Sequence, residues 1–278
     1  MRIPGIKLYR KIRYRKGFGV HSPFVYNLIT QIIEDKNAYY VFDDIEKFRN
    51  KLLSEKNETG RITLEETQSR NYGAILFRLA HFFRCQTIVE IGSSTGIMGL
   101  YLATASRAQS RCYLLEEREN VLQTLHQWAL AHNLQHIHCM TGQYKETIQS
   151  LSLRMQKADL IFINQPAVSM DVEAVISLCR PLIGKQSILI LNDIVRNKEV
   201  KTVWQTLKEH PQSRVMLDLY ELGIVFFDDK LPKRYYKSYF KHEKKQNLYK
   251  NRRRGIHFLG WRKKSTKNTS SHRGLRNY

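Results

Sequence analysis

The fold of this chain is decided by residues 87–103, which read TIVEIGSSTGIMGLYLA. An apolar, β-branched run ends in a carboxylate, a Gly/Ser turn follows, and an apolar stripe at helical spacing comes next. The pattern predicts a strand, a tight loop and a helix, which is the opening unit of a nucleotide-type α/β fold. Gly92 and Gly96 let the backbone approach a ligand at the carboxyl end of the strand, where open α/β sheets bind small molecules.

The spacing of the glycines excludes the dinucleotide fingerprint G-x-G-x-x-G. Counted from Gly92, that fingerprint needs glycines at positions 94 and 97, where this chain has Ser94 and Ile97. The pattern that remains is an acidic residue, Glu90, followed by G-x-x-x-G.

Further apolar segments follow at a steady interval and predict four more strands, at residues 112–116, 136–140, 158–163 and 187–191. Amphipathic stretches such as 121–129 and 200–207 lie between or after them and predict helices. Alternation of strands and helices implies a parallel sheet that is covered on both faces.

The alternation ends near the C-terminal side of the sheet. Residues 214–220 and 224–227 both predict strands, and the three residues between them are too few for a crossover helix, so the pair is predicted to be an antiparallel hairpin. Upstream, residues 63–66 fit a capping box that would start a helix running to Phe83. Residues 20–56 predict one or two helices that begin near Pro23 and Asp43.

Five parallel strands, a terminal antiparallel hairpin and an acid before G-x-x-x-G resemble the class I S-adenosylmethionine (SAM) dependent methyltransferases. Residues 19–24, 72–79, 192–194 and 217–227 also look like segments of a methyltransferase-like group common in Bacteroidetes-type bacteria, and the likeness covers roughly residues 15–240. The resemblance implies a Rossmann-like α/β fold, SAM as cofactor, and transfer of a methyl group to an unidentified acceptor.

The resemblance also implies which residues bind the cofactor: Glu90, Gly92, Ser93, Ser94, Gly96, Glu116, Gln143 and Asn164. Glu90 is expected to hold the amino end of SAM, and Gln143 the adenine amino group. Glu116 ends the second strand, where a carboxylate, which only accepts hydrogen bonds, suits two ribose hydroxyls. Glu117 is the competing candidate for that role.

Methyl transfer requires placement of the acceptor and, for some acceptors, a base. Asp193, at the end of the fifth strand, is our candidate for a base or an acceptor-orienting residue, and a helix N-cap is the alternative. His21 is a second candidate, which could close over the acceptor, or be structural.

Metal-dependent catechol-type relatives place an Asp after strand four and an Asp-Asn pair after strand five. Here Asn164 and Asn192-Asp193 offer one carboxylate, so we expect no catalytic metal.

A second interpretation stays open beside the enzyme. Asn164 stands where the bacterial group usually has an Asp, and the charge of the chain is unusual. The alternative is therefore a catalytically inactive SAM-fold binding module that associates with nucleic acid.

The net charge of +21 is concentrated at the two ends of the 278-residue chain. Residues 1–19 hold seven Lys/Arg and no acids, residues 230–278 hold seventeen and one acid, and residues 20–229 hold 22 bases and 24 acids. Aromatic residues are interleaved with the bases of the C-terminal segment. This mixture suits contact with RNA or DNA through the basic termini. A solvated tail without a specific partner is the favoured alternative, and attraction to an anionic membrane face is a third interpretation.

These observations divide the chain into a basic and helical N-terminal segment (1–62), a SAM-binding domain (63–240) and a basic tail (241–278). Four widely spaced cysteines without a C-x-x-C pair favour reduced thiols and a cytoplasmic protein. The longest apolar strands have six or seven residues, far fewer than a membrane span needs, and the N-terminus does not fit a signal peptide.

Overall fold

A computed structural model describes residues 5–14, 17–37, 39–105, 110–118, 121–155, 157–164 and 172–240. The chain divides into two compact units, Met1–Glu243 and Lys244–Tyr278. The predicted basic tail, and the contact with nucleic acid expected of it, lie outside the described residues.

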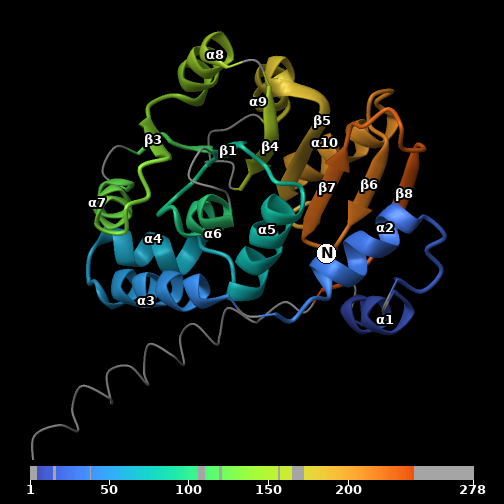
Figure 1. The fold of residues 1–278 in the computed structure, drawn as a ribbon, viewed down its shortest axis with the longest axis horizontal. Coiled ribbons are helices and arrows are strands. Elements are labelled where there is room, and N and C mark those ends of the chain that lie inside the picture. The colour runs from blue at the N-terminus through green and yellow to red at the C-terminus, as the bar shows by residue number, and fades with distance from the viewer. Residues whose placement is uncertain are drawn as a thin grey trace, which may run out of the picture. The chain divides into compact units, whose positions relative to one another are not determined.

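The centre of the first unit is an eight-stranded sheet with the order β3-β2-β1-β4-β5-β7-β6-β8 (Figure 1). The strands are β1 (Thr87–Ile91), β2 (Arg111–Glu116), β3 (Ile137–Thr141), β4 (Ala158–Ile163), β5 (Ile183–Asn192), β6 (Val215–Asp218), β7 (Leu222–Phe226) and β8 (Arg234–Lys237). Strands β1 to β5 are parallel to one another, and β7 is antiparallel to both β5 and β6. The predicted fold class, with its terminal antiparallel hairpin, is confirmed. Strand β8, which pairs in parallel with β6, was not expected from the sequence.

Helices cover both faces of the sheet. They are α1 (Ile6–Arg13), α2 (Pro23–Leu28), continued by a π-helical turn η2 (Ile29–Ile33), α3 (Tyr40–Ser54), α4 (Glu58–Glu66), α5 (Arg70–Phe82), α6 (Ile97–Ala105), α7 (Gln123–Ala131), α8 (Tyr144–Arg154), α9 (Val172–Cys179), followed by a 3₁₀ turn η3 (Arg180–Leu182), and α10 (Lys198–Glu209). Adjacent residues of β1 show how the faces alternate, because Ile88 joins the core under α5 and α6 while Val89 joins the core under α8, α9 and α10. Both side chains are fully buried.

The helix predicted from the capping box at residue 63 is wrong in its start and in its continuity. The first helix of this region begins at Asn57, whose side chain accepts a hydrogen bond from Gly60 N at 3.0 Å. Thr63 lies inside α4 and its hydroxyl donates to Thr59 O. The chain leaves the helix at Thr67, which is extended (ψ 138°), and α5 starts only at Arg70. The break matters for the site because it brings Thr67 to the β1–α6 loop.

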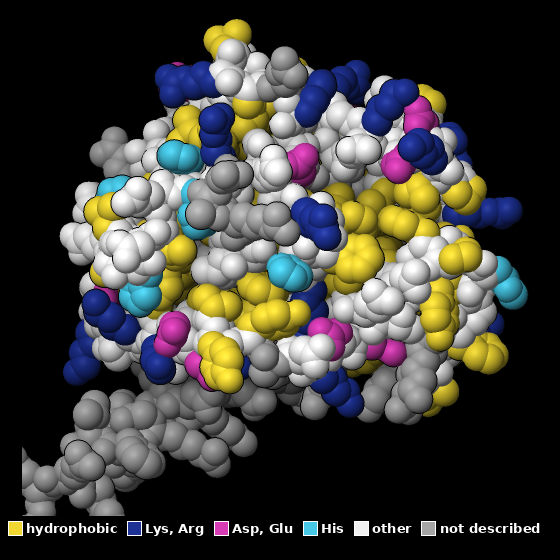
Figure 2. All heavy atoms as spheres, viewed as in Figure 1, with side chains coloured by type: hydrophobic (Ala, Val, Ile, Leu, Met, Phe, Trp, Pro, Cys, Tyr) yellow, Lys and Arg dark blue, Asp and Glu magenta, His cyan; other side chains and the backbone are white. Residues whose placement is uncertain are grey.

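The N-terminal helices and the sheet belong to one compact unit of the chain. The predicted boundary between residues 62 and 63 falls inside α4, and both sides of it belong to the unit Met1–Glu243. Figure 2 shows basic and acidic side chains mixed across the face that it draws, in keeping with the balanced charge of residues 20–229. Within the described residues, no helix combines the length and apolar character needed to cross a bilayer.

Candidate functional site

The loop between β1 and α6 lies at the carboxyl ends of the parallel strands, where the strand order reverses between β1 and β4. It turns sharply because three residues have positive φ angles: Gly92 (75°), Ser94 (51°) and Gly96 (77°). A Cβ at residue 96 would overlap the side chain of Leu125, so this position needs glycine for space as well as for backbone freedom.

Backbone contacts fix the loop on the neighbouring strand. The N–H groups of Gly92 and Ser93 both donate to Leu115 O at 3.0 Å, and the Ser93 hydroxyl donates to Glu90 O at 3.3 Å. The loop is therefore held against β2 at the point where that strand ends.

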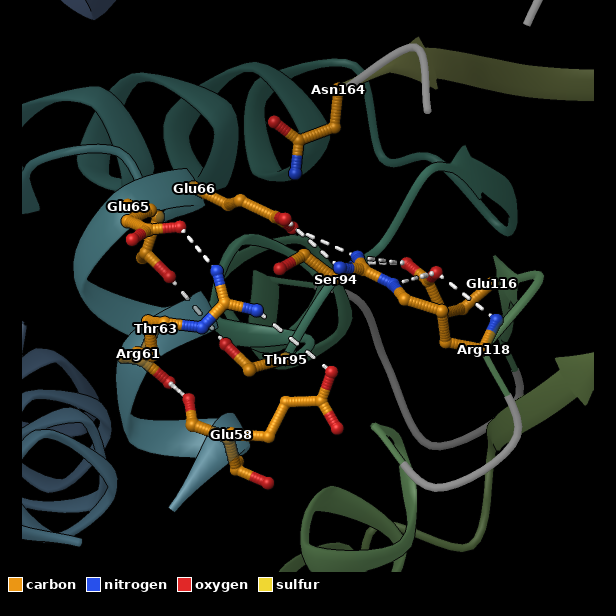
Figure 3. A network of polar contacts seen from close by, with 12 residues as sticks. Glu58, Arg61, Thr63, Glu65, Glu66, Ser94, Thr95, Glu116, Arg118 and Asn164 are labelled. Atoms are coloured by element: carbon orange, nitrogen blue, oxygen red, sulfur yellow. Dashed lines mark hydrogen bonds and ion pairs between the residues drawn. The ribbon is translucent and has the colours of Figure 1, made fainter. Parts of the chain in front are cut away.

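The carboxylate of Glu116 lies directly against this loop (Figure 3). Ser94 N donates to Glu116 Oε2 at 2.7 Å, and Arg118 Nε donates to Oε1 at 2.7 Å. Glu116 is 2% exposed. Its neighbour Glu117 instead accepts a 3.5 Å hydrogen bond from Tyr144 N. Of the two acids considered for the ribose, the structure places Glu116 beside the loop.

Arg118 connects Glu116 to the N-terminal helices. Its two terminal nitrogens donate to the carboxylate of Glu66, at the end of α4, at 2.9 and 2.8 Å. Burial raises the pKa of Glu66, but hydrogen bonding to Arg118 and the charge of Arg118 outweigh this and hold the pKa below its usual value. Hydrogen bonds to Glu66 and Glu116 raise the pKa of Arg118. A permanently charged guanidinium thus joins two carboxylates at the edge of the loop.

Glu90 is fully buried below the loop. Asn164 Nδ2, at the end of β4, donates to Glu90 Oε1 at 2.8 Å. Glu90 Oε2 has no hydrogen-bond partner among the described residues, and it lies 2.5 Å from the point where a Cβ on Gly99 would be. Burial raises the pKa of Glu90 well above its usual value, with the hydrogen bond from Asn164 opposing the shift. The protonated acid is therefore favoured here.

A chain of buried polar contacts extends from Asn164 across the switch point. Asn192 Nδ2, at the end of β5, donates to Asn164 O at 2.6 Å, and Asn192 Oδ1 accepts from the Tyr72 hydroxyl of α5 at 2.8 Å. Tyr72, Asn192 and Asn164 are at most 4% exposed. The ends of three strands and one helix are thus joined by a single network, which fixes Asn164 above Glu90.

Asp193 follows this network at the edge of the sheet. It has a positive φ angle of 60°, and its Oδ1 accepts hydrogen bonds from Arg196 N at 3.1 Å and Arg196 Nε at 3.0 Å. It does not begin α10, because the N-cap of that helix is Asn197, whose side chain accepts from Glu199 N and Val200 N.

His21 lies just before α2, next to its N-cap Ser22, and its side chain is exposed. Phe24, three residues later, contacts the rings of Phe83 and Phe226. The catalytic role of His21 stays a prediction.

The remaining predicted residue, Gln143, is exposed at the start of α8, immediately after β3. β3 pairs with β2 so that Thr141 is opposite Glu116, which puts Gln143 on the same edge as the loop. Among the described residues there is no group of three His, Cys, Asp or Glu side chains that could hold a metal ion.

Sequence reasoning missed Arg118, Glu66 and Tyr72. Arg118 follows Glu116 by two residues, but side chains two positions apart need not meet once a strand has ended. Glu66 and Tyr72 come from helices whose approach to the loop depends on the break at Thr67. The Thr67 hydroxyl is 3.5 Å from the Thr95 hydroxyl, and no local sequence pattern encodes that contact.

The sequence of residues 89–194 matches a family model described as a methyltransferase domain. That range begins in β1 and ends just beyond β5, so it contains the loop, Glu116, Asn164 and Asp193. No curated protein matches the chain.

Several solved structures share the fold. An O-methyltransferase from Bacillus cereus, in complex with SAH, is 15% identical and superposes with a TM-score of 0.55 over 71% of this chain and 94% of its own. The SAH-bound methyltransferase PaMTH1 of Podospora anserina is 12% identical, with a TM-score of 0.57 over 70% and 91%. A methyltransferase from Geobacter sulfurreducens is 13% identical, with a TM-score of 0.52 over 70% and 93%. At these identities the likeness shows the fold.

Proposed function

We propose that this protein is an enzyme that binds SAM and transfers its methyl group to an acceptor. One observation is central to the proposal: within the segment that matches the methyltransferase domain, Ser94 N lies 2.7 Å from a carboxylate oxygen of Glu116 at the switch point of the sheet. The SAH bound to the Bacillus cereus and Podospora anserina structures supports a cofactor of this class.

The hydrogen-bonding groups at the loop are of the kind that the ribose of such a cofactor needs. Two hydroxyl donors need an acceptor, and the carboxylate of Glu116 is one. Both of its oxygens already accept hydrogen bonds, Oε1 from Arg118 Nε and Oε2 from Ser94 N and Arg118 Nη2. Ribose hydroxyls at Glu116 must therefore compete with the guanidinium of Arg118, which keeps Glu66 as a second partner.

We assign Glu90 to the amino end of the cofactor, together with Asn164. An ammonium group close to Glu90 would favour its ionised form and lower its pKa, against the effect of burial. Asn164 Nδ2 donates to Glu90 Oε1, so a shift of Asn164 would free that oxygen for the ammonium group.

The cofactor supplies an activated methyl group on a sulfonium, with a neutral leaving group. The chain must then exclude water, place the acceptor, and accept its proton where needed. Asp193 is our candidate for the last task. Its Oδ1 is held by Arg196, which fixes the carboxylate and leaves Oδ2 as the oxygen we assign to the acceptor proton.

Isothermal calorimetry on the full chain, with SAM and then SAH as titrant, tests the cofactor assignment. We expect binding by the parent protein and by Glu117→Ala, the matched control. Glu116→Ala should bind about 5- to 150-fold more weakly, because leaving ribose hydroxyls unpaired costs about 1–3 kcal/mol. Parent-like affinity of a folded Glu116→Ala variant, or no binding by the parent, would show that the assignment is wrong.

A catalytically inactive SAM-fold binding module is the second candidate, favoured by the engagement of both Glu116 oxygens by protein groups. Methyl-labelled SAM separates the two. Transfer of the label to a component of a cell extract, lost in Asp193→Asn, supports the enzyme. SAM binding without any transfer supports the module.

A further inference from the structure

Helix α1 presents Leu8 and Ile12 to solvent and buries Arg10. Leu8 is 62% exposed and Ile12 is 72% exposed, whereas Arg10 is 8% exposed. A surface helix of a globular protein normally does the reverse. This inversion requires an explanation, because exposed aliphatic side chains forgo the free energy that burial would provide.

The orientation of α1 is fixed by Arg10. Its guanidinium makes two hydrogen bonds to the carboxylate of Asp218, at 2.6 and 3.1 Å. The same carboxylate accepts from Tyr235 Oη at 2.6 Å and Tyr220 N at 2.7 Å, and the guanidinium lies 5.2 Å from the centre of the Tyr220 ring. The helix therefore cannot turn its apolar face inward without breaking the Arg10–Asp218 pair.

Helical geometry puts Leu8 and Ile12 on one face. Residues four apart lie about 40° from each other, and each of these two lies roughly 160° from Arg10. Tyr9, 56% exposed, borders the same face, and Phe18, 68% exposed, follows α1 in the chain. At the corner where Figure 1 draws α1, Figure 2 shows hydrophobic side chains at the surface.

Basic residues flank this face in sequence. Lys7, Lys11 and Arg13 belong to α1, and residues 1–19 contain seven Lys/Arg without an acid. On a helical wheel Arg13, which is exposed, lies about 40° beyond Tyr9, on the side away from Ile12. An apolar face within a basic helix is the pattern of helices that lie in a lipid–water interface.

We propose that this face of α1, formed by Leu8, Tyr9 and Ile12, docks onto the surface of an anionic lipid bilayer. The aliphatic side chains would enter the boundary between headgroups and acyl chains, and the basic residues would contact anionic headgroups. Nucleic acid fits less well, because its stacking partners are aromatic while the centre of this face is aliphatic. A second copy of the chain fits less well too, because the basic residues of the two copies would repel each other.

Helix α1 contacts the same edge of the sheet that contains the candidate site. Asp218 is the last residue of β6, and β6 runs in the same direction as β5 because both are antiparallel to β7. The carboxyl end of β6 therefore belongs to the edge that contains Glu116 and Asn192. The inference itself does not depend on the proposed methyl transfer.

Vesicle flotation with the full chain tests the proposal, using phosphatidylcholine alone and phosphatidylcholine with phosphatidylserine. We expect binding to the anionic vesicles only. Leu8→Ser/Ile12→Ser should bind about tenfold or more weakly, because two aliphatic side chains no longer enter the lipid. Leu153→Ser is the matched control, since Leu153 is 89% exposed on α8, away from this face, and should bind as the parent does.

The comparison is made within the full chain because residues 241–278 are also basic and add attraction of their own. Circular dichroism and the thermal midpoint confirm that each variant is folded. Vesicle binding that is equal in Leu8→Ser/Ile12→Ser and in the parent would overturn the proposal. So would a parent that ignores anionic vesicles, or self-association that disappears in the double variant.

Discussion

Arg118 covers the carboxylate of Glu116, with Nε 2.7 Å from Oε1 and Nη2 3.2 Å from Oε2. The same guanidinium is bound to Glu66 of α4 (Figure 3). The carboxylate that we assign to the ribose is thus neutralised by the protein, and the helix beside the loop is tethered by the same group. If Glu116 binds the cofactor as we propose, cofactor binding and the attachment of α4 are coupled through the side chain of Arg118.

Removal of this guanidinium should have opposite effects on stability and on cofactor binding. In Arg118→Ala, Glu116 and Glu66 lose their partner, and we expect the free energy of unfolding to fall by about 1–3 kcal/mol. The affinity for SAM should rise, because ribose hydroxyls no longer compete with Arg118. Denaturant unfolding and calorimetry measure the two quantities, with Arg111→Ala, an exposed position on β2, as control. A weaker affinity for SAM in Arg118→Ala would mean that the arginine itself binds the cofactor.

The β1–α6 loop needs glycine at position 96 for two reasons: its positive φ angle and the close approach of the Leu125 side chain. Gly96 and Gly19 both have a φ angle of 77°, but an added Cβ would overlap Leu125 at the first and would meet only Arg13 Nη1, at 3.8 Å, at the second. We expect Gly96→Ala to cost about 1–3 kcal/mol more stability than Gly19→Ala. Adding Leu125→Ala should lower that extra cost; if the two glycine variants are equally stable, steric contact is not the reason for Gly96.

The buried acid Glu90 should make the protein less stable as pH rises. Burial raises its pKa in the folded state, so the folded chain retains a proton that the unfolded chain releases above about pH 4.5. The stability that this proton provides is complete below that pH and is lost as pH rises toward the folded-state pKa, by up to about 1.4 kcal/mol per pH unit. Denaturant unfolding between pH 5 and 8 should show this slope in the parent and a reduced one in Glu90→Gln. Equal slopes would mean that Glu90 is ionised in the folded protein.

The fold followed from sequence because it depends on local patterns. The run from Thr87 to Ile91 and the glycines at 92 and 96 determine strand and loop through residues that are neighbours in the chain. The hairpin also followed from a short spacer, but the structure places that spacer at residues 219–221 and not at the predicted residues 221–223. The helix start at Pro23 was also correct, and the second helix starts at Tyr40, three residues before the predicted Asp43.

The site was predicted only where it belongs to those same patterns. Glu116 follows from its position at a strand end, whereas the Arg118–Glu66 contact joins residues 52 positions apart. Such contacts depend on how α4 approaches the sheet. That approach depends on the break at Thr67, and the capping-box pattern at Thr63 predicted a single continuous helix there instead. Long-range polar contacts of this kind have no periodicity for a sequence to display.

The Arg10–Asp218 pair should hold α1 against the end of β6. Burial raises the pKa of Asp218, but the hydrogen bonds and charge of Arg10 outweigh it and lower the pKa below the usual value. Arg10→Ala leaves a buried carboxylate without its cation, and we expect a loss of about 3–5 kcal/mol at pH 7. Because a depressed pKa gives stability that is present above the unfolded value and lost as pH falls, the parent should lose this contribution below about pH 4. Hydrogen exchange of α1 in Arg10→Ala is the direct measurement; unchanged protection would contradict the anchoring role.

The basic C-terminal segment should be separable from the body. The division of the chain at Glu243 and the closure of the sheet by β8 indicate that removal of residues 244–278 leaves the thermal midpoint and SAM affinity nearly unchanged. We propose that this segment binds RNA or DNA, so the full chain should bind a single-stranded oligonucleotide at low salt and the truncated chain should not. Binding should weaken steeply between about 50 and 200 mM salt, through release of counterions. A truncated chain that unfolds would show that the segment is structural, and a full chain that ignores both nucleic acids at low salt would eliminate the nucleic-acid role.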